Sequence, residues 1–257
     1  MRFWWFYILM FFGLYFVNGQ DSSFMICNKP FEIDRKEVFV DCIEYKKEKM
    51  NFREALDIAS QGIRKYPYSY NLRLKRALLL ENLGNTAFSE KELIGLIKLY
   101  PEKQELHNYL GRIFYEKDKS KALLALLTSI AIEPNNSMSR ENLLFVKRML
   151  RGRTMYAHIA KSDSPLSSFK IDDFDIINYK LDRMDKSLGV SLNNLPERLD
   201  FFFKTLHEYD HRKEGFFWEY YAQKFISIYV NDKTDEFASH LYGIQVDRGL
   251  RNRMIEK

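Results

Sequence analysis

The chain has 257 residues, of which 46% are hydrophobic and 29% charged, so it can build one large helical domain or two small ones. Its net charge is +5 with basic and acidic residues interspersed, and this mild balance argues against a nucleic-acid-binding protein. Only 6 prolines and 11 glycines interrupt it. Because these residue types break helices, their scarcity favours an all-α fold.

Residues 1–19 have the order of a secretory signal peptide. Met1-Arg2 give a short basic start, Phe3 to Val17 form an uncharged run, and Asn18-Gly19 complete a small-residue exit. A membrane-spanning helix needs roughly 20 apolar residues, more than this run offers, although the run could also stay uncleaved as an anchor. We expect cleavage near Gly19 and a periplasmic or secreted protein without a transmembrane span.

Residues 20–36 form an N-terminal segment ahead of the repeats, and it contains Cys27. Cys42 is the second of the two cysteines. Oxidising compartments favour pairing of such cysteines, and closing a loop this short would stabilise the fold by about 3 kcal/mol in the chain-entropy model. We predict a Cys27–Cys42 disulfide that ties this segment to the first repeat helix. The alternative is a free thiol at Cys27 and a small buried side chain at Cys42.

A period of about 34 residues runs through residues 37–151. Prolines mark it, at Pro67, Pro101 and Pro134. A small residue precedes each proline by 12 positions, namely Ala55, Ser89 and Ala122. A fixed period of this length is typical of a solenoid built from two-helix hairpins.

The clearest unit is HNYLGRIFYEKDKSKALLALLTSIAIEPNN, residues 107–136. In it Leu110-Gly111 is followed by Phe114, then by Ala122 and Leu126, and finally by Pro134. This order resembles the tetratricopeptide repeat (TPR) family, whose pattern runs L-G-x-x-Y, then A-x-x-x-F, then P. The resemblance implies about three repeats and a trailing helix over 37–151, in which small residues let paired helices approach closely.

The C-terminal third is predicted to be a helical cap. A turn-rich stretch, SDSPLSS, falls within a linker over residues 152–170, and helical spacing of apolar residues returns in 171–257. Residues 216–230 are apolar on most sides, so a helix there would be buried nearly all round. The aromatic residues in this helix, Trp218, Tyr220 and Tyr221, could be read as a ligand box, but core packing is the simpler interpretation. His107 is likewise interpreted as a packing residue.

One segment matches a catalytic motif that a helical-repeat protein would not need. The segment His207-Glu208-Tyr209-Asp210-His211 matches H-E-x-x-H, which on a helix places two imidazoles on one face beside a carboxylate, as in zinc proteases. On a helix over 195–211, however, both histidines fall on the flank of the apolar stripe and Glu208 falls opposite it. The charged residues Asp210 and Arg212 also depart from the zinc-protease pattern. We expect polar surface roles for His207 and His211 and keep zinc binding as the alternative.

The TPR resemblance implies that the first helices of the hairpins line a concave groove, which takes a partner peptide or protein surface. In the repeat register the groove-facing candidates are Asn71, Lys75, Asn108, Arg112, Asn142 and Arg148. Such side chains would clamp a carboxylate or the backbone of an extended peptide. The alternative is that they are ordinary solvated positions. The family's charged clamp is not matched residue for residue, so the ligand type stays open.

The sequence therefore predicts an exported, all-α, non-enzymatic protein-interaction module. It would act as an adaptor or assembly subunit of a cell-envelope complex, with a protein or peptide partner, no nucleic acid and no cofactor. The alternative is a zinc-dependent metallohydrolase that uses His207, Glu208 and His211.

Overall fold

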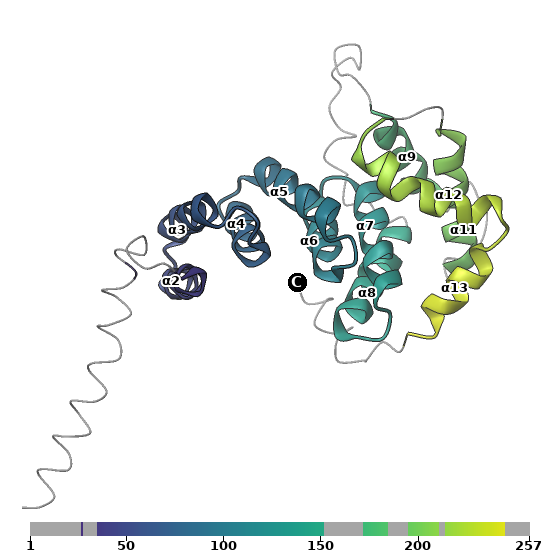
Figure 1. Cartoon of the computed structure of the whole chain (residues 1–257). Coiled ribbons are helices and arrows are strands. Elements are labelled where there is room, and N and C mark those ends of the chain that lie inside the picture. Colours follow the sequence, from purple (N-terminus) through teal and green to yellow (C-terminus); the bar gives the residue numbers. More distant parts are fainter. Residues whose placement is uncertain (1–26, 28–34, 152–171, 185–194, 211–213, 245–257) are drawn as a thin grey trace, which may run out of the picture. The chain divides into compact units, whose positions relative to one another are not determined.

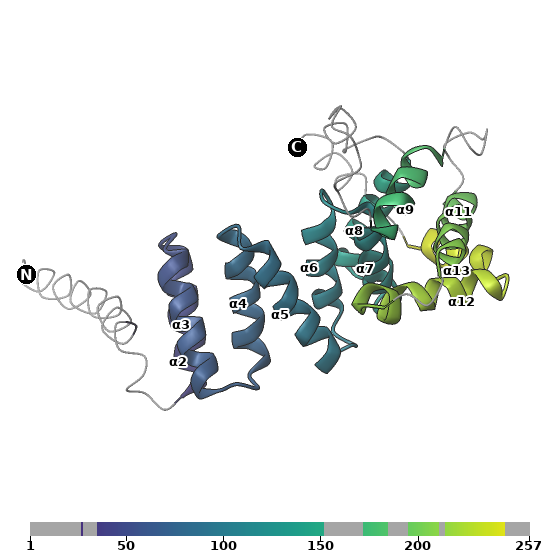
Figure 2. The same cartoon turned by 90° about the horizontal axis from the view of Figure 1, so that it is seen from above.

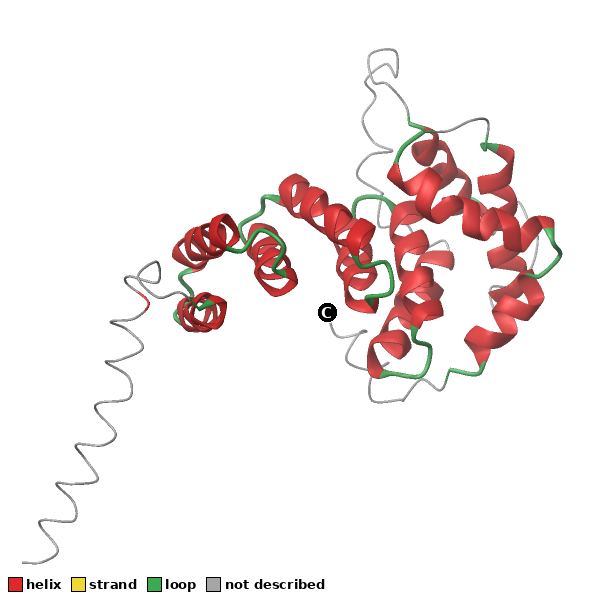
Figure 3. Cartoon of the chain, viewed as in Figure 1, coloured by secondary structure: helices red, strands yellow, loops and turns green. Residues whose placement is uncertain are grey.

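The computed structural model describes residues 27, 35–151, 172–184, 195–210 and 214–244, and the regular structure in these ranges is entirely helical (Figure 3). The predicted all-α class is therefore confirmed. The predicted signal peptide 1–19, the linker 152–170 and the N-terminal segment up to residue 34, apart from Cys27, lie outside the described residues. Among the described helices, none has the length and apolar character needed to cross a bilayer.

The repeat region and the cap are both built from short helices (Figure 1). In the repeat region these are α2 (Lys36–Glu48), α3 (Phe52–Lys65), α4 (Tyr70–Asn82), α5 (Thr86–Leu99), α6 (Gln104–Phe114), α7 (Lys119–Ile132) and α8 (Ser137–Leu150). In the cap they are α9 (Asp173–Asp182), α11 (Leu195–Glu208), the π-helix η4 (Phe217–Ala222), α12 (Gln223–Val230) and α13 (Thr234–Tyr242).

Within each compact unit of the repeat region, helices that follow one another also pack against one another. In the first compact unit, Met1–Leu96, α3 packs on both α2 and α4, and in the second, Ile97–Lys257, α7 packs on both α6 and α8 (Figure 2). This arrangement of consecutive packed helices is compatible with a helical-repeat solenoid, as the 34-residue period predicts.

In the first unit, α3 shows how the sequence selects its buried face. Asn51 caps the helix by accepting a hydrogen bond from the Glu54 backbone N–H. The buried residues of α3 follow at helical spacing and are Ala55, Ile58, Ala59 and Gly62. Gly62 lies directly against Phe39 of α2 and Leu72 of α4, both fully buried, and the other three belong to the same core cluster.

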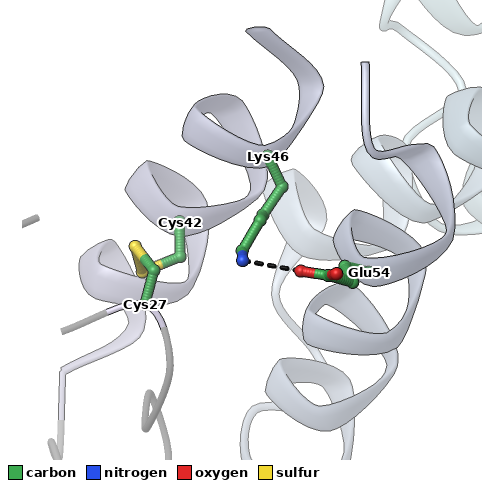
Figure 4. The surroundings of a disulfide bond; sticks show 4 residues. All are labelled: Cys27, Cys42, Lys46 and Glu54. Atoms are coloured by element: carbon green, nitrogen blue, oxygen red, sulfur yellow. Dashed lines mark ion pairs between the residues drawn. A yellow bond between two sulfur atoms is a disulfide. The ribbon is translucent and has the colours of Figure 1, made fainter. Parts of the chain in front are cut away.

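The predicted disulfide is present and joins Cys27 to Cys42 on α2, with the two Cα atoms 5.1 Å apart (Figure 4). Nearby, the Lys46 ammonium of α2 lies 2.6 Å from the Glu54 carboxylate of α3. The disulfide therefore ties residue 27 to α2, and the ion pair joins α2 to α3.

Ser89 occupies a slot of the repeat where alanine is usual in the TPR pattern. The side chain is fully buried on α5, and its hydroxyl donates a 2.8 Å hydrogen bond to the carbonyl of Ala77 on α4. This bond satisfies the only polar atom that Ser adds to Ala, so the helices can still approach closely.

In the second unit, α7 is buried on all sides. Its residues from Ala122 to Ile130 are all buried, because α6, α8, α9 and η4 each pack against it. The cap therefore covers the side of α7 that the repeat helices leave open, and α11 extends the cover to α8. The helical cap predicted for the C-terminal third is confirmed.

Polar side chains fix the two ends of α7. At its start, the Asn178 amide of α9 accepts a 2.7 Å hydrogen bond from the Ser120 N–H and donates a 2.9 Å bond to the N-cap residue Asp118. At its end, the Gln104 amide of α6 donates to the carbonyls of Ser129 and Glu133, at 2.9 and 3.0 Å. Helix-terminal groups that would otherwise be buried without partners are thus satisfied.

We expect loss of the disulfide to cost about 3 kcal/mol of unfolding free energy, because the cross-link restricts the unfolded chain over a short loop. Urea unfolding of wild type with and without reductant, and of Cys27→Ser, measures this. Cys27→Ser should match reduced wild type; equal stability of the oxidised and reduced protein would contradict the expectation.

Gly111 sits where α6 and α7 approach most closely. A Cβ at this position would lie 2.6 Å from both Cγ and Cδ2 of Leu126, so we expect Gly111→Ala to force the helices apart. Gly95→Ala is the matched control, since that Cβ would meet only the end of the Arg73 side chain at 3.1 Å. Both changes gain similar helix propensity. Chemical denaturation should therefore find Gly111→Ala less stable than Gly95→Ala by about 1–3 kcal/mol, whereas similar values would refute the close packing.

Candidate interaction site

Six residues on and beside α6 and α8 define one candidate site in the second unit, and two of them, Asn108 and Tyr115, are buried. Asn108 and Arg112 lie on α6, Tyr115 is the residue that caps its C-terminus, and Glu141, Phe145 and Arg148 lie on α8. In both sets the spacing is i, i+4, i+7, which places the three side chains of each helix on one face. We call this set the α6–α8 cluster.

Arg112 holds the α6–α8 cluster together. Its guanidinium carbon lies 3.6 Å from the centre of the Phe145 ring, and its Nη2 lies 2.6 Å from the Glu141 carboxylate. The Tyr115 ring contacts the same Phe145 ring edge-on, with centres 4.7 Å apart. Because a stacked and ion-paired guanidinium has little rotational freedom, the cluster presents a preorganised cationic and aromatic surface.

The α6–α8 cluster combines a buried tyrosine with two arginines that are at least partly exposed. Burial raises the pKa of the Tyr115 hydroxyl, and the nearby Arg148 and Arg112 partly offset this rise. Arg148 is exposed, and Arg112 is partly exposed. The face thus offers an exposed cationic group beside an aromatic pair, a combination suited to a carboxylate next to an apolar group.

Asn108 and Asn142, both predicted to face the groove, are largely inside the fold. Asn142 is fully buried and donates a 3.1 Å hydrogen bond to the Ser129 hydroxyl, and Asn108 is 9% exposed. On α8 it is Glu141, the residue before Asn142, whose partly exposed side chain reaches Arg112. The groove-facing interpretation of Asn142 is therefore corrected: the weak repeat pattern in 138–151 fixes the register only to within one residue.

The two groove candidates of the first unit have different environments. Asn71 is exposed at the start of α4. Lys75 forms an ion pair with Glu44 of α2, and Glu44 also pairs with Lys47 at 2.8 Å. The pKa of Glu44 is lowered; burial opposes the change, and the hydrogen bonds from the two lysines outweigh it. Lys75 thus links α2 to α4.

The H-E-x-x-H segment is only partly described, since His211 lies outside the described residues. His207 and Glu208 are exposed at the end of α11. Glu208 accepts a 2.9 Å hydrogen bond from Lys180 of α9, and this bond raises the pKa of Lys180. Across the described ranges, no three His, Cys, Asp or Glu side chains lie close enough together to hold a metal ion.

His107 makes a buried contact with the cap that the sequence does not reveal. It is fully buried on α6, and its Nδ1 lies 2.7 Å from the hydroxyl of Tyr221 in η4. Its Nε2 lies 2.9 Å from the carbonyl of Pro101. A carbonyl can only accept, so Nε2 carries the proton and Nδ1 accepts from the tyrosine hydroxyl. This pair joins segments 114 residues apart, beyond the reach of any local sequence pattern.

Burial sets the protonation of this pair. It lowers the pKa of His107 to about 4, with the Pro101 hydrogen bond opposing the shift and Lys224 adding to it. Burial also raises the pKa of Tyr221 well above its ordinary value. Both side chains are therefore neutral near pH 7, as a hydroxyl-to-imidazole hydrogen bond requires.

The aromatic residues of η4 belong mainly to the core. Trp218 and Tyr221 are buried, and Tyr220 stacks on the His107 ring with centres 5.9 Å apart. Phe217 contacts both Phe114 of α6 and Phe174 of α9. The core interpretation of Trp218 and Tyr221 is thus confirmed.

No family model matches the chain, and no curated protein is significantly similar to it. The TPR likeness therefore remains a resemblance of pattern.

Protonation of His107 should destabilise the protein at acid pH. Its pKa is about 4 when folded and about 6.5 when unfolded, so the unfolded chain binds more protons between these values. The contribution is fully present above about pH 6.5 and falls by about 3 kcal/mol as the pH drops through 4. Urea unfolding across pH 4–7 should show a flatter pH dependence for His107→Gln than for wild type. Parallel curves would contradict this assignment.

Proposed function

We propose that the protein is an exported, non-enzymatic helical-repeat module that binds a protein or peptide partner. Support comes first from the consecutive packed helices within each unit, which resemble TPR hairpins. The Cys27–Cys42 disulfide is compatible with export, because such bonds persist outside the reducing cytosol.

The observation that carries the proposal is the α6–α8 cluster. Arg112 stacked on Phe145, with Tyr115 packed against the same ring, is the chemistry that dominates protein interfaces, where arginine and aromatic residues contribute most of the binding energy. Arg148 lies exposed at the end of this face. We infer a partner segment that places a carboxylate on Arg148 and an apolar group against Phe145, as an adaptor or assembly subunit of an envelope complex would require.

A crosslinking pull-down from an envelope fraction tests this with Arg148→Glu. Charge reversal at an exposed position should leave the fold intact and weaken capture of the partner at least tenfold, which corresponds to about 1.4 kcal/mol. The matched control is Arg53→Glu, an exposed arginine on α3, the second helix of its hairpin. Retention of each captured protein by Arg148→Glu would exclude this face as the docking surface.

Metal analysis of the same protein distinguishes the zinc-hydrolase alternative. A non-enzymatic module should contain no stoichiometric zinc. Stoichiometric zinc that is lost in His207→Ala would favour the hydrolase and remove the basis for the adaptor role.

A further inference from the structure

The turn between α7 and α8 carries a modification motif. Its sequence, Asn135-Asn136-Ser137, matches N-x-S with a residue other than proline in the middle, which is the acceptor motif for N-linked glycosylation of secreted proteins. No other asparagine of the chain has a serine or threonine two positions later. The chain therefore offers a single position at which such a modification can occur.

The fold accounts for only the middle residue of this motif. Asn136 is the N-cap of α8: its side-chain oxygen accepts a 2.8 Å hydrogen bond from the Ser139 N–H, and its amide nitrogen donates to Gln104 of α6. The motif asks nothing of this position except that it not be proline. The two residues that the motif specifies are Asn135 and Ser137, and neither side chain forms a hydrogen bond within the described residues.

Both specified residues are open to solvent. Asn135 is exposed in the turn, and Ser137 is exposed at the first position of α8. Pro134 precedes them and lacks the backbone N–H that helix continuation would need. Glycan acceptors lie on surface loops, because the transferase has to reach the asparagine nitrogen. A glycan on Asn135 displaces no buried contact, so the fold and the modification are compatible.

We propose that Asn135 is the acceptor of an N-linked oligosaccharide, an inference that rests on the proposed export. Such glycans are added in secretory compartments, and the Cys27–Cys42 disulfide is compatible with one because it persists outside the reducing cytosol. The donor is an oligosaccharide joined to a polyisoprenyl diphosphate. Asn135 Nδ2 attacks C1 of its first sugar, the new N–C bond replaces the C–O bond to the leaving diphosphate, and the amide nitrogen gives up one proton.

The glycan and the proposed docking face do not compete for the same surface. Ser137 begins α8 and Arg148 lies in its last turn, about 16 Å away along the helix axis. The partner contact inferred at Arg148 therefore leaves the α7–α8 turn uncovered. A test that reads the glycan alone is also independent of the pull-down.

Expression of the full chain, with its own N-terminus, in eukaryotic secretory cells tests the site. We expect digestion with peptide-N-glycosidase to increase the mobility of the secreted protein, and mass spectrometry to find Asn135 converted to aspartate. Asn135→Gln and Ser137→Ala should each abolish the mobility shift. Ser137→Thr is the matched control, because threonine also satisfies the motif, and it should keep the shift.

A reporter variant distinguishes failure of this site from failure of export. Ala87→Thr creates a second motif beginning at Asn85, and both positions are exposed at the start of α5. A glycan on Asn85 without one on Asn135 would overturn the site while export stands. Absence of a glycan from both would contradict the export on which the site and the proposed function rest. A shift that persists in Asn135→Gln would assign the glycan to another residue and overturn the proposal.

Discussion

The structure of the second unit depends on the burial of α7. A helix that is apolar on every side cannot face water anywhere, so it needs neighbours around its whole circumference. The repeat hairpin supplies α6, the trailing helix supplies α8, and the remaining faces are covered by η4 and α9. The cap is therefore part of the same interior as α6, α7 and α8, and the edge-on contact of Phe217 with Phe114 of α6 joins the two.

Polar contacts determine how this cover is positioned. The Asn178 hydrogen bonds fix α9 over the start of α7, and the His107–Tyr221 bond fixes η4 beside α6. Apolar packing alone is non-directional, whereas a buried hydrogen bond tolerates little displacement, because an unpaired buried partner costs about 1–3 kcal/mol. A few such bonds therefore select one arrangement of the cap. The first unit uses other means: the disulfide ties residue 27 to α2, and the Lys46–Glu54 pair joins α2 to α3.

Much of the fold could be predicted from local patterns. The 34-residue period predicted the hairpins, and the small residues Gly111 and Ala122 marked the close approach of α6 and α7. The disulfide followed from two cysteines in a chain with an export-like start. What could not be predicted depends on long-range contacts. The partner of His107 is 114 residues away, and no periodic signal connects them.

The candidate site was predicted less well, for a physical reason. Arg112 lies near Gly111, where the repeat register is strong, and its groove role stays a prediction. Asn142 lies where that register weakens, and its side chain is fully buried. Phe145 and Tyr115 were missed because an aromatic residue at a helical position is most often core.

α7 should be the most deeply enclosed helix of the second unit, and the exchange rates of its backbone amides test this directly. In the oxidised full-length protein, amides of 122–130 should exchange only through global unfolding of that unit, more slowly than those of α13, whose outer face is exposed. If the α7 amides exchange as fast as those of α13, the repeats and the cap do not share one interior, and the account is wrong.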